Sequence, residues 1–118
     1  MITQAGSPAD ELTGRCTTTS PAPFRACAVD VPLAGVVSVT AEVLARNVST
    51  GRLAWRELRG RFTRDEQGIR YLDAPTEDGF VMVGFELPRG GSKVFVRCEP
   101  GEERCEWAWQ VRTLTVGE

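Results

Sequence analysis

The amino-acid sequence predicts an all-β protein, an antiparallel β-sandwich or jelly roll with an extended N-terminal arm. Three observations indicate this class. Apolar residues alternate with polar ones in several segments, turn-forming residues recur about every ten to fifteen residues, and almost no segment shows the 3.6-residue period of a helix. With 118 residues, of which 42% are hydrophobic, the chain is large enough for one globular domain.

Residues 1–33 have the composition expected of the arm. They hold four of the seven prolines, together with clusters of serine and threonine. Because proline has a fixed φ angle and no backbone N–H, this backbone is expected to be extended or turned. Only the segment PADELTG, residues 8–14, offers a possible helical turn or two. Residues 34–118 are predicted to form the β-sandwich domain.

The first strand of this domain is predicted from residue 36. In VVSVTAEVLAR the odd positions from Val37 to Ala45 are apolar and the positions between them are mostly polar, with Leu44 as the one exception. This alternation is typical of a strand with one face in the core and one in solvent. The turn-forming segment NVSTG follows.

The next predicted strand, LAWRELRGRFTRD, places Leu58 and Phe62 on one parity. Trp55 falls on the other parity, and a β-bulge at Arg56-Glu57 is predicted to move it to the core side. Further on, FVMVGFEL is apolar on both parities, which predicts a central strand or one covered by a partner.

The last two strands are predicted at KVFVRC and CEWAWQVRTLTV. Trp107 and Trp109 share one parity with Cys105 and Val111, so they are expected to fill the core. The segment between these strands contains a Pro-Gly pair, which predicts a hairpin.

Four cysteines are expected to form disulfide bonds. A hairpin between the last two strands would set Cys98 opposite Cys105, close enough for a bridge. Cys16 and Cys27 form the second expected pair, although four cysteines allow three pairings and the sequence alone does not choose among them. A zinc site is the rival interpretation, but gaps of ten and six residues without any histidine are unlike structural zinc motifs.

Enzymatic chemistry is not expected. Without histidine, the usual catalytic triads and the commonest general base are missing, and the glycines match no phosphate-binding loop. No cofactor or metal is predicted. The net charge of -2 and the pI of about 5.3 argue against nucleic acid or an anionic membrane as partners. The N-terminus lacks a secretory signal, and no apolar run is long enough to span a membrane.

Surface contacts are expected to involve the arginine-rich strand. Arginine side chains bind carboxylates in fixed geometry, which suits a subunit interface, although solvated sheet faces would also carry such charges. Trp55 is a candidate for an exposed contact because of its parity. The candidate interface residues are Trp55, Arg56, Arg59, Arg61 and, from the arm, Phe24.

Residues 36–116 resemble the small β-domains of tailed-bacteriophage virion proteins, which occur in tail fibres, other appendages and head-decoration proteins. Four features carry the resemblance: a strand of alternating small apolar residues, a Thr50-Gly51 turn, an aromatic-containing strand that ends at a charged turn with glycine, and a final tryptophan strand. The cysteines are not typical of those domains.

The resemblance implies a non-enzymatic virion structural protein, either a capsid decoration (cement) protein or a head-tail appendage subunit. Such a protein would be made in the host cytoplasm and would stabilise the particle through its N-terminal arm and its β-sandwich. Its expected partners are the major capsid or tail subunits and other copies of itself, most favourably as a trimer. The alternative is a secreted, extracellular binding module with disulfide bonds, such as a protein inhibitor or a carbohydrate-binding domain.

Overall fold

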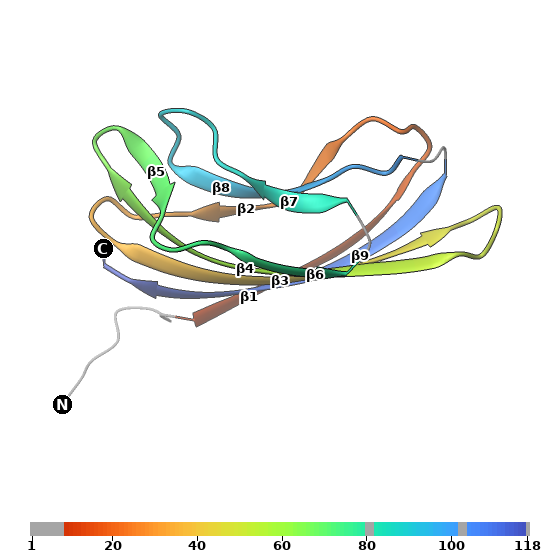
Figure 1. Cartoon of the computed structure of the whole chain (residues 1–118), viewed down its shortest axis with the longest axis horizontal. Helices are drawn as coiled ribbons and strands as arrows, with labels where there is room; N and C mark the ends of the chain where they lie inside the picture. The colour runs from red at the N-terminus through yellow and green to blue at the C-terminus, as the bar shows by residue number, and fades with distance from the viewer. Residues whose placement is uncertain (1–8, 80–81, 102–103, 118) are drawn as a thin grey trace.

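The computed structural model describes residues 9–79, 82–101 and 104–117. In these ranges the protein is an all-β sandwich of two antiparallel sheets, which confirms the predicted fold class (Figure 1). The larger sheet has the strand order β1-β9-β3-β4-β5, with β6 also paired to β4. Its strands are β1 (Ala9–Thr18), β9 (Cys105–Val116), β3 (Val36–Asn47), β4 (Leu53–Asp65), β5 (Gly68–Tyr71) and β6 (Thr76–Gly79).

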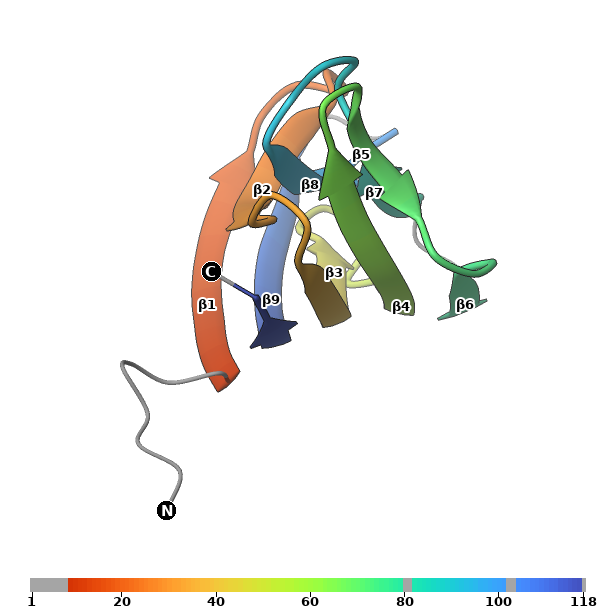
Figure 2. The same ribbon diagram turned by 90° about the vertical axis from the view of Figure 1, so that its left-hand side faces the viewer.

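The smaller sheet has the order β2-β8-β7, and its strands are β2 (Phe24–Asp30), β8 (Lys93–Cys98) and β7 (Val83–Glu86). The six-stranded sheet curves around it, so the face turned away from the small sheet is convex (Figure 1). We call this face the outer face. Figure 2 shows β1 at one edge of the large sheet, with β9, β3 and β4 following in order.

The core lies between the two sheets. Alternate residues of β3, β4 and β9 meet those of β8, as the period of a strand requires. Aromatic side chains join the layers: Phe62 of β4 packs edge-on against Phe85 of β7 at 5.0 Å, and Phe24 of β2 against Trp107 of β9 at 5.3 Å. The residues buried in this core are Val29, Val31, Val37, Val39, Ala41, Val43, Leu58, Phe62, Val83, Val94, Val96, Cys98, Cys105, Trp107 and Val111.

The alternation in β3 and the burial of Trp107 and Val111 agree with the sequence. The predicted bulge at Arg56-Glu57 is wrong, because β3 and β4 pair from Arg46↔Leu53 to Val36↔Thr63 without a register shift. Trp55 therefore stays on the outer face, where 41% of its surface is exposed. A sandwich strand has an outer face that also accepts apolar side chains, so no bulge is required.

The predicted hairpin between the last two strands is also wrong. β8 belongs to the small sheet and β9 to the large one, so the segment between them crosses from one layer to the other. FVMVGFEL is not a central strand either: β7 covers only Val83–Glu86 and lies at an edge of the small sheet, and residues 80–81 are outside the described ranges. The other predicted possibility, a strand covered by a partner, stays a prediction.

Most of the predicted arm is part of the sandwich. β1 pairs with β9 over ten residues, and β2 pairs with β8. The backbone of this region is extended, as its composition indicates, but an extended segment beside an unpaired strand satisfies its N–H and C=O groups by joining the sheet. The division near residue 33 therefore does not separate an arm from the sandwich, and residues 9–14 are strand, not helix. Residues 1–8 lie outside the described ranges.

Candidate interaction surface on the six-stranded sheet

Three large apolar side chains lie together on the outer face, and we call them the outer patch: Leu44 on β3, and Leu53 and Trp55 on β4. They are exposed over 51%, 76% and 41% of their surfaces. Leu44 and Trp55 are directly opposite each other in the β3–β4 register, and Leu53 lies opposite Arg46 one row further along. On its other side Leu44 faces Ala108 of β9, which continues the apolar row.

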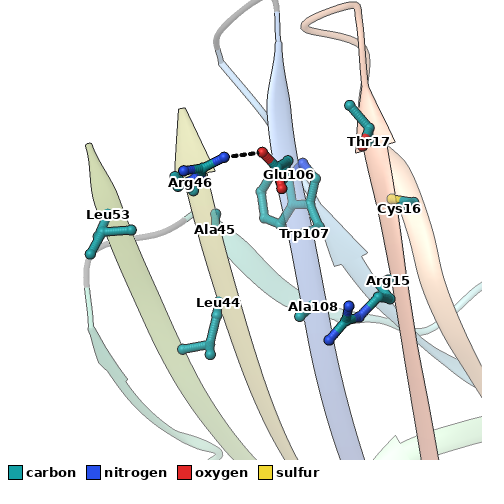
Figure 3. A pocket seen from close by; sticks show the side chains of 10 residues that line it. All are labelled: Arg15, Cys16, Thr17, Leu44, Ala45, Arg46, Leu53, Glu106, Trp107 and Ala108. Atoms are coloured by element: carbon teal, nitrogen blue, oxygen red, sulfur yellow. Dashed lines mark hydrogen bonds and ion pairs between the residues drawn. The ribbon is translucent and has the colours of Figure 1, made fainter. Parts of the chain in front are cut away.

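Beside the outer patch, the end of the large sheet is hollowed. The hollow has a volume of about 530 Å³. Figure 3 shows Leu44 beside Ala108, and, nearer the end of the sheet, Leu53 in one row with the ion pair between Arg46 and Glu106. Residues from β1, β9, β3 and β4 all contribute to its lining. An apolar centre with a charged rim is the usual composition of a protein interaction surface.

Arg59 and Arg61 of β4 lie on the same face, but their charges are largely balanced within the chain. Arg59 pairs with Glu57 at 3.1 Å, and Arg61 pairs with Asp73 at 3.2 Å. Each of these pairs is exposed, so each contributes little to stability. Because the carboxylates offset the guanidinium groups, this face does not present the concentrated positive charge that a polyanion would require.

Five side chains were expected at an interface, and they divide into two groups. Trp55, Arg59 and Arg61 share the outer face of β4. Arg56 has the opposite parity: only 18% of its side chain is exposed, it binds Glu77 at 3.1 Å, and its Nε atom is buried without a hydrogen-bond partner. Phe24 is half-buried against Trp107 and Trp109 in the core, so its ring is occupied with internal packing. The structure therefore brings three of the five together on the outer face.

Sequence reasoning missed Leu44, Leu53 and the Arg46–Glu106 pair. A signal for Leu44 was present, because it is the one apolar residue at a polar position in an otherwise regular alternation. On a half-buried strand, a large apolar side chain on the solvent side marks a surface that another molecule can cover.

The four cysteines lie on four strands: Cys16 on β1, Cys27 on β2, Cys98 on β8 and Cys105 on β9. Both expected pairs therefore join strands of different sheets, so neither is the cross-strand bridge of a hairpin. Cys16, Cys27 and Cys98 are free thiols in the structure. The described ranges hold no group of three or more histidine, cysteine or acidic side chains placed to bind a metal ion. They also include no helix of the length and hydrophobicity that crossing a membrane requires.

Burial controls the chemistry of these thiols. It raises the pKa of Cys16 and of Cys27 above the ordinary value of 9.0. For Cys98, burial and then the nearby Cys16 thiol raise the pKa to about 12. A thiol with a raised pKa is a poor nucleophile at neutral pH because the reactive thiolate is scarce. The raised pKa values therefore favour a packing role for these three thiols.

The raised pKa of Cys98 predicts a loss of stability at alkaline pH. Below about pH 9 the Cys98 thiol is protonated in both the folded and unfolded states, so its full contribution to the free energy of unfolding is present. Between about pH 9 and 12 only the unfolded state loses the proton. The free energy of unfolding should then fall by up to about 1.4 kcal/mol per pH unit from this group. Urea unfolding of wild type and Cys98→Val from pH 7 to 10.5 measures the difference, and equal slopes in the two proteins would contradict the assignment.

The class of protein that the fold defines is a small antiparallel β-sandwich with an exposed apolar patch on one sheet. No protein-family model matches the sequence. No curated protein matches it either.

Three solved structures of phage tailspike proteins are similar in fold. They come from Acinetobacter baumannii phage AM24 (7% identity, TM-score 0.47, 93% of this chain covered), Acinetobacter baumannii bacteriophage Fri1 (11%, 0.41, 98%) and Acinetobacter phage vB_ApiP_P1 (7%, 0.44, 99%). The Fri1 protein is described as a capsular polysaccharide depolymerase. This chain spans only 27%, 21% and 23% of their lengths. The TM-scores are below 0.5, so the similarity assigns neither a family nor an activity to this chain.

Proposed function

We propose that this chain is a non-enzymatic structural protein of a tailed-bacteriophage particle, in an appendage or on the head, and that it attaches to a neighbouring capsid or tail subunit through the outer patch. The resemblance of residues 36–116 to small β-domains of phage virion proteins supports the class of protein. The outer patch is the observation that carries the attachment. Its three side chains are apolar, adjacent and exposed on a rigid sheet.

The energetics of the outer patch favour a protein partner. Covering the exposed halves of Leu44 and Trp55 and most of Leu53 would contribute about 1 kcal/mol or more for each side chain. The sheet holds these residues in place before binding, so little conformational entropy is lost on association. Arg46 and Glu106 at the rim can exchange their exposed ion pair for charges on the partner, which adds specificity more than affinity.

Matched leucine substitutions test this proposal. Leu44→Asp places a charge in the centre of the outer patch, and Leu33→Asp places the same charge at a similarly exposed leucine in the β2–β3 connection, with exposures of 51% and 54%. Each protein is mixed with particles of the phage that encodes it, assembled without this protein. Bound protein is then measured by co-sedimentation and immunoblotting.

Leu44→Asp should reduce binding about tenfold or more, because a charge cannot be buried without a partner. Leu33→Asp should bind like wild type. Equal binding of all three proteins would rule out the outer patch as the attachment surface. Failure of the wild-type chain to bind particles at all would contradict the virion assignment.

A binding module for carbohydrate is the second candidate. The hollow beside the outer patch favours it, because Arg15, Arg46 and Glu106 offer hydrogen-bonding groups next to apolar surface. Trp55 lies beside this hollow, directly opposite Leu44 and two residues from Leu53 on the same strand. In this case a glycan array should identify a ligand, and Trp55→Ala should weaken its binding while Trp55→Phe keeps most of it. The same variants would have little effect on a glycan bound elsewhere.

A further inference from the structure

β1 is the longest unbroken edge strand among the sheet edges that the structure describes. The opposite side of the large sheet is divided between β5 and β6, with four residues each, and β7 at one edge of the small sheet also has four. β2, at the other edge, has a register shift between Arg25 and Cys27. Short strands and bulges are the features that shield an edge from pairing with another chain. β1 has neither, because its ten residues pair with β9 in continuous register.

The charges of β1 are arranged symmetrically about its middle. Glu11, Thr13 and Arg15 are exposed on the outer face, and Leu12 and Gly14 between them are partly buried on the inner side. If a second copy of β1 pairs antiparallel with the first and the two Thr13 residues lie opposite each other, residues at equal distance from Thr13 become neighbours. Glu11 then faces Arg15 of the partner subunit, and Arg15 faces Glu11 of the partner subunit. Opposite charges in directly paired positions stabilise strand pairs.

The inner side of the same register is also complementary. Leu12 would face Gly14 of the partner subunit. A Cβ atom on Gly14 would lie 2.5 Å from the Trp109 ring, so that ring occupies the space beside this glycine. The leucine of one copy can therefore pack beside the tryptophan of the other. A groove of about 620 Å³, lined by Asp10 and Leu12 of β1 and by Val29 of β2, opens along this edge. In the paired arrangement the Leu12 end of each groove lies beside Gly14 of the partner subunit.

We propose that two copies of this chain associate through antiparallel pairing of their β1 strands about a two-fold axis at Thr13. The two six-stranded sheets then form one continuous sheet. The contact uses the same surface on both copies, so it closes at two subunits and not at the three favoured from sequence. Backbone hydrogen bonds along the edge supply affinity, and the two Glu11–Arg15 pairs fix the register.

Charge reversal tests this register, because the symmetry places each substitution in the interface twice. Glu11→Arg alone creates two arginine pairs across the interface and removes the Glu11–Arg112 pair within each chain. Arg15→Glu alone creates two glutamate pairs, and the double variant restores two opposite-charge pairs across the interface. Lys93→Glu, an equivalent reversal on β8 of the small sheet, is the matched control. Sedimentation equilibrium at low ionic strength measures the dimer dissociation constant of each protein, and circular dichroism checks that each is folded.

Wild type should be a dimer. Each single reversal in β1 should raise the dissociation constant about tenfold or more, and the double variant should recover most of the loss. Lys93→Glu should behave like wild type. A wild-type chain that stays monomeric up to its solubility limit would overturn the proposal. So would a trimer, or a dimer that the reversals leave unchanged. The outer patch lies on β3 and β4 and shares no residue with the β1 edge. Arg15 also lines the hollow beside the patch, so Glu11→Arg is the variant that separates this proposal from the attachment proposed above.

Discussion

A chain that lacks residues 1–30 is expected to be unfolded. The deletion removes β1 from one edge of the large sheet and β2 from one edge of the small sheet. It also removes Phe24, whose ring packs against Trp107 and Trp109. Without β2, the strand β8 becomes an edge strand, and its buried Val94 and Val96 lose the neighbouring strand that helps to cover them. Exposing this much apolar surface costs more than the 5–15 kcal/mol by which such domains are stable.

Near-UV circular dichroism and urea unfolding measure this effect. The truncated chain should show no near-UV signal and no cooperative transition, whereas the full chain should show both. If the chain without residues 1–30 keeps a cooperative transition, these residues form a separate arm, as their composition suggests, and the strand pairings of β1 and β2 do not carry stability.

Phe62→Ala is expected to cost about 3–5 kcal/mol, the range for removing a fully buried aromatic ring. Phe62 has no exposed surface, and its ring lies 5.0 Å from the rings of both Phe85 and Tyr71. The neighbouring Gly60 shows how closely this region is packed, because a Cβ there would lie 2.8 Å from the Phe62 ring. The surrounding sheets cannot collapse into the space that the substitution leaves.

Equilibrium unfolding in urea gives the loss of stability directly. Tyr71→Ala is the control, since 38% of the Tyr71 surface is exposed and its removal leaves a smaller cavity. The loss for Phe62→Ala should exceed that for Tyr71→Ala by at least about 1 kcal/mol. Similar losses for the two variants would mean that Phe62 is not a central element of the core.

The sequence predicted the parts of the fold that depend on local periodicity. β3 alternates over its whole length, so its core positions were identified, and the same parity rule placed Trp107 and Val111 inside. Strand pairing could not be predicted in this way. The segment between Cys98 and Cys105 has the composition of a hairpin turn, but it joins the two layers, and nothing in its local sequence distinguishes the two connections.

The same limit applies to the first thirty residues and to the interaction surface. Proline and serine indicate an extended backbone, yet whether an extended segment joins a sheet depends on a distant partner, here β9 for β1. Of the candidate interface residues, Trp55 is exposed on the outer face, as its parity predicts and the continuous β3–β4 register explains. Arg56 and Phe24 lie elsewhere, because the first turns inward to Glu77 and the second packs on the tryptophans of β9.

Photocross-linking from the outer patch tests its assignment as the attachment surface most directly. A benzophenone amino acid replaces Leu53, the most exposed member of the patch, and in a second protein it replaces Leu33 as the control. After assembly on phage particles and irradiation, mass spectrometry identifies the linked proteins. The proposal predicts that position 53, but not position 33, is linked to one capsid or tail subunit. Links from position 33 alone, or equal links from both positions, would contradict it.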